Sequence, residues 1–502
     1  MSKFDPAEIL SLFSYHPGHP LSFVSGFFIV FLSAALLLYP LSSRNRNVRI
    51  CYLLVLSLFF YYKAGGLHVG LLLLSAMLDF WLGLKVFRSW PAPGSRMWMW
   101  MGIAGNLLVL VAFRYAPWGG RLLLRLAPWE AGAGALIVPV GISFYVFQKI
   151  SYLIDVYRRK TPPATRPADF LLYVAFFPRV IAGPIVRAGE FFPQLERSPS
   201  ESEQATGEAL YLILAGLFKK AVIADYLAIS FINRVFAAPG LYSGLENLLA
   251  VYGYALQLYC DFSGYTDMAL GIARLFGIRL PQNFRSPYKA ATISEFWQRW
   301  HITLSEWLRD YLFLPAANAL SRRIQADRVL GLRTELWLYG TSAMLTSLVC
   351  GLWHGAAWGF VIWGLIHGTA LTLEKLFRIP QKTRKSGLRR FLGRVVSFHV
   401  VCLAWIFFRA DTLETARLVL YQIGGHFHVR LFPQFIQGYP LVTGLMALGF
   451  FLHYLPDRAK DRMQRSLAAM PLVVQSLILA GMIWIVLQMQ SADIQPFIYF
   501  QF

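Results

Sequence analysis

Two histidines stand in surroundings that suit acid-base chemistry. His301 lies in the run Arg-Trp-His-Ile-Thr, and His354 lies in the run Gly-Leu-Trp-His-Gly-Ala. Burial disfavours the charged imidazolium, so a buried ring stays neutral and can accept a proton near neutral pH. Such a ring can act as the general base that activates a hydroxyl group for attack on a thioester. A buried histidine can equally be a hydrogen-bonded structural group, and the surrounding residues leave both interpretations open.

Other catalytic patterns are weak or missing from the sequence. It contains no Gly-x-Ser-x-Gly elbow, no His-Glu-x-x-His helix and no glycine-rich phosphate loop. His426 and His428 alternate, but two histidines are too few to argue for a metal site. The four cysteines stand apart in apolar segments, which indicates neither disulfides nor zinc. We therefore expect no metal and no bound cofactor.

The segment 292–314, which contains His301, is predicted to form one helix. Thr292 and Glu295 have the spacing of a capping box, and Pro287 disfavours helix before it. A helix would gather the large side chains of this segment on two neighbouring faces. Those faces would carry Trp297, His301, Ser305 and Leu308, and Trp300, Leu304, Trp307 and Tyr311. Such a helix suits a cavity wall, or alternatively the membrane interface with tryptophans as anchors.

The chain around this segment is mostly apolar. Of its 502 residues, 57% are hydrophobic and 15% are charged, far from the balance of a soluble domain. The clearest apolar runs lie at residues 21–40, 49–62, 67–84, 97–113, 133–157, 336–353, 357–376, 394–410, 440–456 and 470–489. They are too long and continuous for the strands of a membrane barrel. The sequence predicts an all-α polytopic membrane protein with about ten to thirteen segments, some of them partial.

Ionisable residues enter apolar context in the middle third of the chain, among them Asp261 and Asp267. Such groups are costly at membrane depth and normally line a cavity or pair with one another. We therefore expect the functional site in this third and in the helices just after it. Arg309 and Asp310 are expected to form a buried pair that is structural or positions a ligand.

The net charge of +21 is concentrated in short loops between the apolar runs. Basic loops mark the cytoplasmic side of a membrane protein, so this charge indicates topology rather than nucleic-acid binding. We expect residues 158–166 and 382–394 in the cytoplasm and both chain ends on the outer face. The basic loops can also contact anionic lipid head groups or an anionic donor such as a coenzyme A thioester, and the sequence does not distinguish these two.

Six blocks of residues stand out in combination, at residues 139–157, 177–187, 261–269, 280–284, 296–311 and 351–365. Together they resemble the membrane-bound O-acyltransferases, in particular their alginate O-acetyltransferase branch. The similarity runs from about residue 135 to residue 410, and the first 130 residues are similar in hydropathy alone. Arg179 stands where we expect a neutral polar residue in close relatives.

The resemblance implies a fold and a set of site residues. The fold is a ring of tilted helices around a central tunnel, in which His354 is the catalytic base and His301 a supporting polar group. Six further residues are expected to contact substrate, namely Trp300, Trp353, Ser305, Asp267, Arg309 and Asp310. We expect a single membrane domain over residues 1–502, with N-terminal helices at 1–130, a catalytic core at 135–410 and C-terminal helices at 411–502.

The resemblance also implies a reaction. Acetyl would pass from cytosolic acetyl-CoA through the bacterial inner membrane toward an exported polysaccharide, or toward a periplasmic acetyltransferase partner. Transfer of a D-alanyl or a long-chain acyl group is an alternative. A transporter or flippase is another, since it would also need ionisable residues inside the membrane, although the two halves show no internal symmetry.

The sequence ends in an aromatic tail at residues 497–502. With this end on the outer face, Tyr499 resembles the aromatic C-terminal motif of the small partner protein in teichoic-acid D-alanylation. The resemblance implies an acyl relay, because a phenol ester formed on Tyr499 would be reactive enough to hand its acyl group on. The alternative is an anchor of aromatic side chains at the head groups.

The basic loops give a testable orientation. In a variant without its native cysteines, Ser386→Cys should react with an impermeant maleimide from the cytoplasmic side only, because the loop 382–394 is predicted to be cytoplasmic. Ser491→Cys, near the chain end predicted outside, is the control and should react in intact cells. Reaction of Ser386→Cys in intact cells would contradict this orientation.

Overall fold

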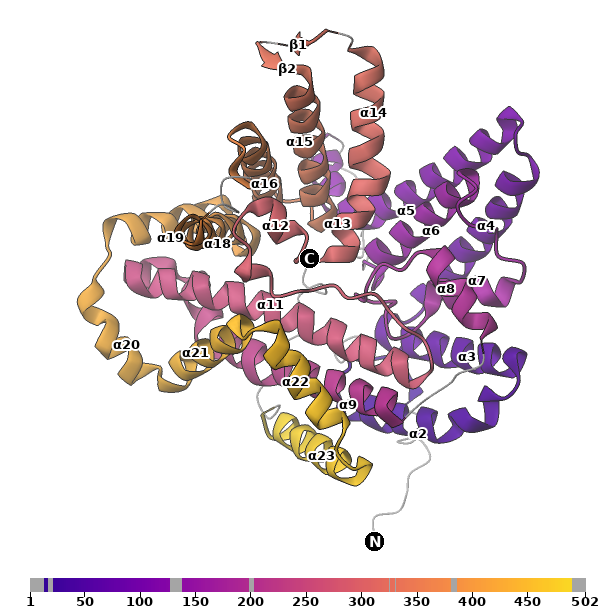
Figure 1. The fold of residues 1–502 in the computed structure, drawn as a ribbon, viewed down its shortest axis with the longest axis horizontal. Helices are drawn as coiled ribbons and strands as arrows, with labels where there is room; N and C mark the ends of the chain where they lie inside the picture. The colour runs from indigo at the N-terminus through magenta and orange to yellow at the C-terminus, as the bar shows by residue number, and fades with distance from the viewer. Residues whose placement is uncertain are drawn as a thin grey trace. The chain divides into compact units, whose positions relative to one another are not determined.

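The protein is built almost entirely from helices. The structure is a computed structural model that describes residues 13–16, 21–126, 138–197, 203–324, 326–329, 331–380 and 386–489. Within these ranges the strands are a short hairpin, in which β1 (Arg328–Val329) pairs antiparallel with β2 (Leu332–Arg333) (Figure 1). The predicted all-α polytopic membrane protein is confirmed.

Six described helices are long and apolar enough to cross a membrane. They are α2 (Gly26–Ser43), α3 (Arg46–Gly65), α4 (His68–Arg88), the Pro93–Tyr115 part of α5 (Pro93–Leu126), α15 (Thr334–His354) and α18 (Gly387–Arg409). Two bent pairs raise this number to as many as eight, namely Val429–Gly438 with Pro440–Tyr454, and Asp457–Ala468 with Leu472–Gln488. Each of the six helices, and the second helix of each bent pair, falls on a predicted apolar run. The ring of helices around a tunnel stays a prediction.

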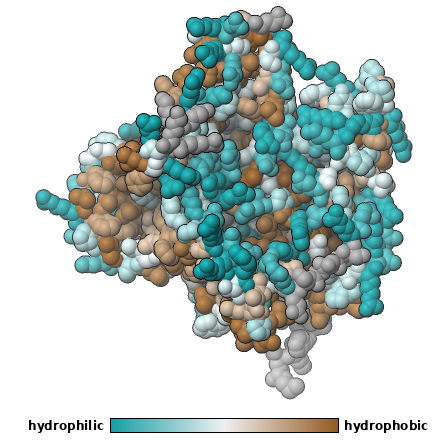
Figure 2. All heavy atoms as spheres, viewed as in Figure 1, coloured by the Kyte–Doolittle hydropathy of each residue, from teal (hydrophilic) through white to brown (hydrophobic). Residues whose placement is uncertain are grey.

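Large apolar side chains lie exposed on these helices, as contact with lipid requires. Examples from α2, α4, α5 and α18 are Leu41, Leu74, Leu108 and Val396. On the face shown in Figure 2, apolar side chains gather over the region of α19 (Leu413–Gly425), α20 (Phe432–Gly438) and α21 (Pro440–Tyr454). Exposed apolar surface of this extent belongs in a membrane rather than in water.

The chain divides into two compact units. The first holds Met1–Ile213, Tyr265–Pro281 and Ala468–Gln475, and the second holds Leu214–Gly264, Gln282–Leu467 and Ser476–Phe502. Helices α9 (Glu203–Leu217) and α11 (Gly244–Leu275) contribute residues to both. Both predicted histidines belong to the second unit.

In the first unit, α7 (Pro167–Ala175) and α8 (Ala188–Glu196) form a hairpin beside α3. Arg46, at the start of α3, forms ion pairs with Asp169 at 2.8 Å and with Glu196 at 2.6 Å, which ties down both ends of the hairpin. Three turns further along α3, about 16 Å away at 1.5 Å per residue, Ser57 Oγ accepts a hydrogen bond from the Phe177 amide at 3.1 Å. The chain therefore enters beside a spanning helix and turns back.

Arg179 lies at the turn of this hairpin and is fully buried. Its guanidinium lies 5.0 Å from the ring centres of both Tyr173 and Phe191. None of its three side-chain nitrogens makes a hydrogen bond within the described part of the chain. Contact with aromatic faces therefore replaces part of the lost hydration of this cation.

A buried ion pair joins three helices of the first unit. Lys149 Nζ on α6 (Ile142–Tyr157) lies 3.2 Å from Asp79 Oδ2 on α4, and both side chains are almost completely buried. Asn106 on α5 donates its Nδ2 to both carboxylate oxygens of Asp79 at 2.9 Å. The sequence analysis missed this pair, although a lysine inside an apolar run was a visible signal.

Removing one partner of this ion pair should destabilise the protein more than removing both partners together. Lys149→Met leaves the Asp79 carboxylate uncompensated and should lower the unfolding free energy by about 3 to 5 kcal/mol. The double variant Asp79→Asn, Lys149→Met should recover most of the loss, measured by thermal unfolding of the solubilised protein. Arg417→Met, in the exposed pair with Glu414, is the control and should cost less than about 1 kcal/mol. Equal destabilisation in the single and double variants would contradict this account.

Candidate active site

His301 interrupts the helix predicted for 292–314. The structure has α12 (Ile293–Trp297) and α13 (Ile302–Leu308), and His301 between them has φ 40° and ψ 55°. This left-handed conformation costs a non-glycine residue roughly 1 to 2 kcal/mol, and such residues cluster at functional sites. The prediction of one continuous helix was wrong. The predicted start is confirmed, because Thr292 Oγ1 accepts a hydrogen bond from the Glu295 amide at 3.0 Å.

Hydrogen bonds from the preceding segment hold this break open. The Asn283 carbonyl accepts from the Ile302 amide at 2.9 Å, and Asn283 Oδ1 accepts from the Thr303 amide at 3.2 Å and hydroxyl at 2.7 Å. On the other side of the break, the buried Glu374 carboxylate accepts from the amide groups of Ile293 and Ser294. These partners satisfy amide groups at the starts of both short helices. Tertiary hydrogen bonds therefore override the local helical pattern.

The His301 ring is buried against aromatic side chains, with 1% of the residue exposed. Its centre lies 4.8 Å from that of Phe262 on α11 and 6.3 Å from that of Trp353 on α15. Burial lowers the pKa of His301 to about 3, because the charged form would lose its hydration. The imidazole is therefore neutral throughout the physiological pH range.

His354 is the last residue of α15 and packs in the same aromatic cluster. Its ring centre lies 4.8 Å from Trp353, 4.9 Å from Phe408 and 5.3 Å from Trp363, all at steep interplanar angles. Trp353 thus contacts both imidazoles. The structure brings the two predicted histidines to one aromatic cluster.

Two glycines bring α16 (Trp358–Leu376) close enough to α15 to form this cluster. A Cβ added at Gly351 would lie 2.2 Å from the carbonyl oxygen of Phe360, and one added at Gly364 would lie 2.6 Å from that of Ser347. Neither distance is compatible with a larger side chain while the backbones stay in place. The two backbones therefore touch just before His354, which fixes the end of α15 against Trp363.

Comparison with known proteins assigns the chain to a family. Residues 164–409 match the membrane-bound O-acyltransferase family. A peptidoglycan O-acetyltransferase of Helicobacter pylori is 35% identical over 395 residues, which cover 74% of this chain and 72% of the relative. The chain belongs to the membrane-bound O-acyltransferase family. A probable alginate O-acetylase of Azotobacter vinelandii is 36% identical over 78% of this chain and 75% of the relative. A teichoic acid D-alanyltransferase of Bacillus subtilis is 30% identical over 54% of this chain and 69% of the relative.

Two other predicted residues of this O-acyltransferase lie beside the break at His301. Trp300 is buried and stacks on Phe296, with ring centres 5.6 Å apart. Ser305 Oγ donates to the carbonyl groups of Trp300 and His301, both at 3.2 Å. Ser305 thus supports the turn that presents His301. Contact of either residue with substrate stays a prediction.

The remaining predicted residues lie elsewhere. Arg309 Nε bonds Asp310 Oδ1 at 2.8 Å, but their side chains are 56% and 33% exposed. The expectation of a buried pair was therefore wrong, because the two residues begin a wide π-helical turn (η5, Arg309–Phe313) that leaves both at the surface of the unit. Asp267 is half-buried in the part of α11 that belongs to the first unit. Tyr499, the predicted relay, lies outside the described residues.

Sequence reasoning singled out Asp261 but missed its partner Lys220 and the buried His367. Lys220 Nζ lies 2.5 Å from Asp261 Oδ1 and 2.8 Å from Asp225 Oδ1, and Asp261 is the neighbour of Phe262. His367 on α16 is fully buried, with its ring 4.8 Å from Trp363 and 5.1 Å from Trp297. A lysine in an apolar run signalled the first group, and no sequence pattern signalled the second.

Acid-base groups, rather than a metal, are what this site offers. Across the described ranges, no three His, Cys, Asp or Glu side chains come together as a metal site would require. A neutral imidazole can accept a proton at one ring nitrogen while it donates a hydrogen bond from the other. The two histidines beside Trp353 are therefore the acid-base groups that this cluster offers.

Two substitutions of His301 should separate its ring from its backbone. Asparagine tolerates the left-handed conformation better than alanine does. The unfolding free energy of His301→Asn should therefore exceed that of His301→Ala by about 1 kcal/mol, and His301→Asn should unfold at the higher temperature. Both should slow acyl transfer, by at most about 100-fold, because both remove the imidazole. Acyl transfer and thermal unfolding are measured on the same samples. Equal stability of the two variants would show that the left-handed turn is not kept.

Proposed function

We propose that this O-acyltransferase passes an acetyl group from cytosolic acetyl-CoA toward an exported cell-surface polysaccharide. One observation carries the proposal, namely that His354 packs in an aromatic cluster that also holds His301. The names of the two O-acetylating relatives support acetyl as the acyl group and a glycan as the class of acceptor.

In this proposal His354 is the general base. Its neutral imidazole accepts the proton of the acceptor hydroxyl while the hydroxyl oxygen attacks the thioester carbonyl carbon. The new C–O bond forms, the C–S bond breaks, and the proton passes from the imidazolium to the leaving thiolate. The rings of Trp353, Phe408 and Trp363 support this role, because they pack around the imidazole and exclude water from it.

His301 assists the same step as a hydrogen-bond donor. A neutral imidazole beside the carbonyl oxygen of the thioester stabilises the negative charge that grows on that oxygen during attack. The lowered pKa of His301 fits this role, since a ring that stays neutral keeps the same donor over the working pH range. Its fixed left-handed backbone supports a preorganised donor.

The route of the acetyl group completes the proposal. The predicted cytoplasmic position of the basic loops supports a donor on the cytoplasmic side of a bacterial inner membrane, with an outer-face glycan or a periplasmic acetyltransferase as the acceptor. In the relay form of the proposal, Tyr499 takes the acetyl group as a phenol ester and delivers it outside. This relay rests on the sequence of the tail alone.

Transfer of D-alanyl is the second candidate function. It is favoured by the similarity to the teichoic acid D-alanyltransferase, which covers less of the chain than the similarity to the O-acetylating relatives does. The two differ in donor, since D-alanyl would arrive on a carrier-protein thioester. Turnover with acetyl-CoA by the purified protein therefore separates them.

His354→Ala should nearly abolish transfer of labelled acetyl from acetyl-CoA. The rate should fall by about 10²-fold to 10⁴-fold, because the general base is missing. The protein should remain folded, since the lost ring stands at the end of a helix. His367→Ala is the matched control, because His367 is a third buried histidine that packs against Trp363 of the same cluster. It should lower thermal stability and keep turnover within about 10-fold of wild type. Near wild-type turnover in His354→Ala would reject the assignment.

A further inference from the structure

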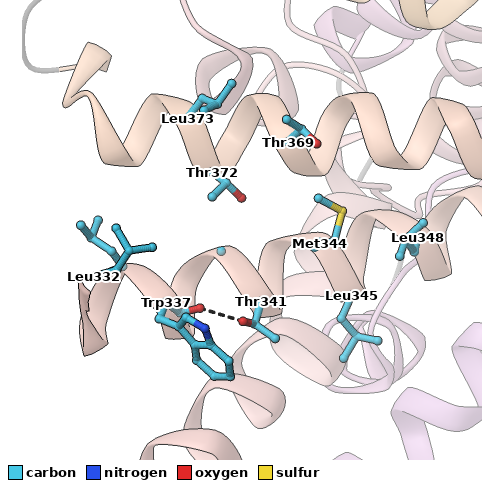
Figure 3. Close-up of a pocket in the computed structure, with 11 residues that line it drawn as sticks. Leu332, Trp337, Thr341, Met344, Leu345, Leu348, Thr369, Thr372 and Leu373 are labelled. Atoms are coloured by element: carbon cyan, nitrogen blue, oxygen red, sulfur yellow. Dashed lines mark hydrogen bonds between the residues drawn. The ribbon is translucent and has the colours of Figure 1, made fainter. Parts of the chain in front are cut away.

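An apolar groove of about 590 Å³ runs along helices α15 and α16, away from the histidines. Figure 3 shows Thr369, Thr372 and Leu373 on α16 across from Trp337 and Met344 on α15. Leu332 of β2 closes one end. The groove follows α15 from its first turns as far as Leu348 and does not include His354, so it is separate from the site described above.

Two of the three threonines that line the groove are bonded to their own helix. Thr341 Oγ1 donates to the Trp337 carbonyl at 2.9 Å, and Thr372 Oγ1 donates to the Gly368 carbonyl at 2.8 Å. Threonine hydroxyls bonded to their own helix offer no donor to an occupant. Thr369 and the indole N–H of Trp337 are the other polar groups of the lining, and the remaining side chains are hydrocarbon or thioether. A lining with so few polar groups favours a hydrocarbon chain as its occupant.

Two arginines face each other at the end that Leu332 closes. Arg328 on β1 is the direct partner of Arg333 on β2, and both are exposed. Like charges placed opposite each other destabilise a strand pair. Within the described ranges, no carboxylate lies within ion-pair distance of either one. An anion between the two guanidinium groups would turn this repulsion into attraction.

The other charged groups at this end leave it positive. Lys375 of α16 is paired with Glu335 of α15 at 3.1 Å, so these two charges cancel. Asp327, next to Arg328, is exposed, and so is Arg378, just beyond α16. The positive charges of Arg328, Arg333 and Arg378 thus exceed the single negative charge of Asp327 at this end. The basic end and the apolar groove together match an anionic head group joined to an acyl chain.

The position of this end in the membrane identifies the source of the lipid. Contact between Lys375 and Glu335 puts the end of α16 and the start of α15 on one side. The chain continues from α16 into the basic segment 382–394, which is predicted to be cytoplasmic. The cytoplasmic leaflet carries the anionic phospholipids.

We propose that this groove binds one acyl chain of an anionic phospholipid of the cytoplasmic leaflet, with its phosphate between Arg328 and Arg333. Guanidinium groups bind phosphate oxygens through paired, charge-assisted hydrogen bonds. The acyl chain then lies along α15 and α16, between Leu332 and Leu348. The site is a lipid site, distinct from the donor and acceptor sites of acyl transfer.

Native mass spectrometry of the delipidated full chain tests the proposal. Phosphatidylglycerol and phosphatidylcholine with identical acyl chains are added in turn, and the bound lipid is counted. One phosphatidylglycerol should bind at least about tenfold more tightly than phosphatidylcholine, and this preference should shrink at high salt. Equal binding of the two lipids would overturn the proposal.

Variants test the arginine pair and the apolar groove separately. The double variant Arg328→Gln, Arg333→Gln should weaken binding of phosphatidylglycerol about tenfold or more and leave phosphatidylcholine unchanged. Thr341→Trp fills the groove and should weaken both lipids. Arg430→Gln, an exposed arginine on a different segment, is the control and should change neither. Thermal unfolding of each variant confirms that it is folded.

Three further outcomes would overturn the lipid assignment. Displacement of phosphatidylglycerol by glycerol phosphate, which has no acyl chain, would mean that the arginines bind phosphate without the groove. A dimer that Thr341→Trp abolishes would mean that the groove holds a helix of a second copy. Unchanged binding of both lipids in Thr341→Trp would place the acyl chain outside the groove.

Discussion

The hydrogen bonds that Asn283 accepts from residues 302 and 303 are the constraint on which the rest of the candidate site depends. They stop the chain from continuing as one helix through His301, and they turn that residue into a left-handed conformation beside Phe262 and Trp353. A continuous helix would spread its side chains evenly around an axis. The break instead places the His301 imidazole beside Trp353 of α15, a helix that is distant in sequence.

Each unit also contains a buried lysine that is matched by carboxylates, Lys149 with Asp79 and Lys220 with Asp225 and Asp261. Such pairs add little net stability, because desolvation of both partners offsets their attraction. Their value lies in specificity, since an apolar helix can slide or rotate against another with little change in contact. In lipid, a lysine displaced from its carboxylates finds no water to hydrate its charge. The pairs therefore fix the register of helices whose surfaces are otherwise alike.

The sequence predicted the features that depend on local pattern. Long apolar runs gave the spanning helices, and the spacing of Thr292 and Glu295 gave the start of α12. The shared cluster of His301 and His354 followed from the blocks that resemble a family. The break at His301 was not predictable, because its cause is an asparagine outside the segment. The exposure of Arg309 and Asp310 and the burial of His367 depend likewise on which neighbours pack against them.

Helix α15 shows how one spanning helix can serve two surroundings. Near its end, Gly351 and the facing Gly364 remove the side chains that would keep α16 away, so the helices touch and His354 is enclosed by rings. Nearer its start, Thr341 and Thr372 line a gap between the helices and turn their hydroxyls to their own backbones. Close contact excludes water around the imidazole that the proposed function uses as a base, and the gap leaves an apolar surface that the proposal assigns to lipid. The glycines thus bring α15 and α16 into close contact beside His354, and the threonines line the gap between the same two helices at the other end.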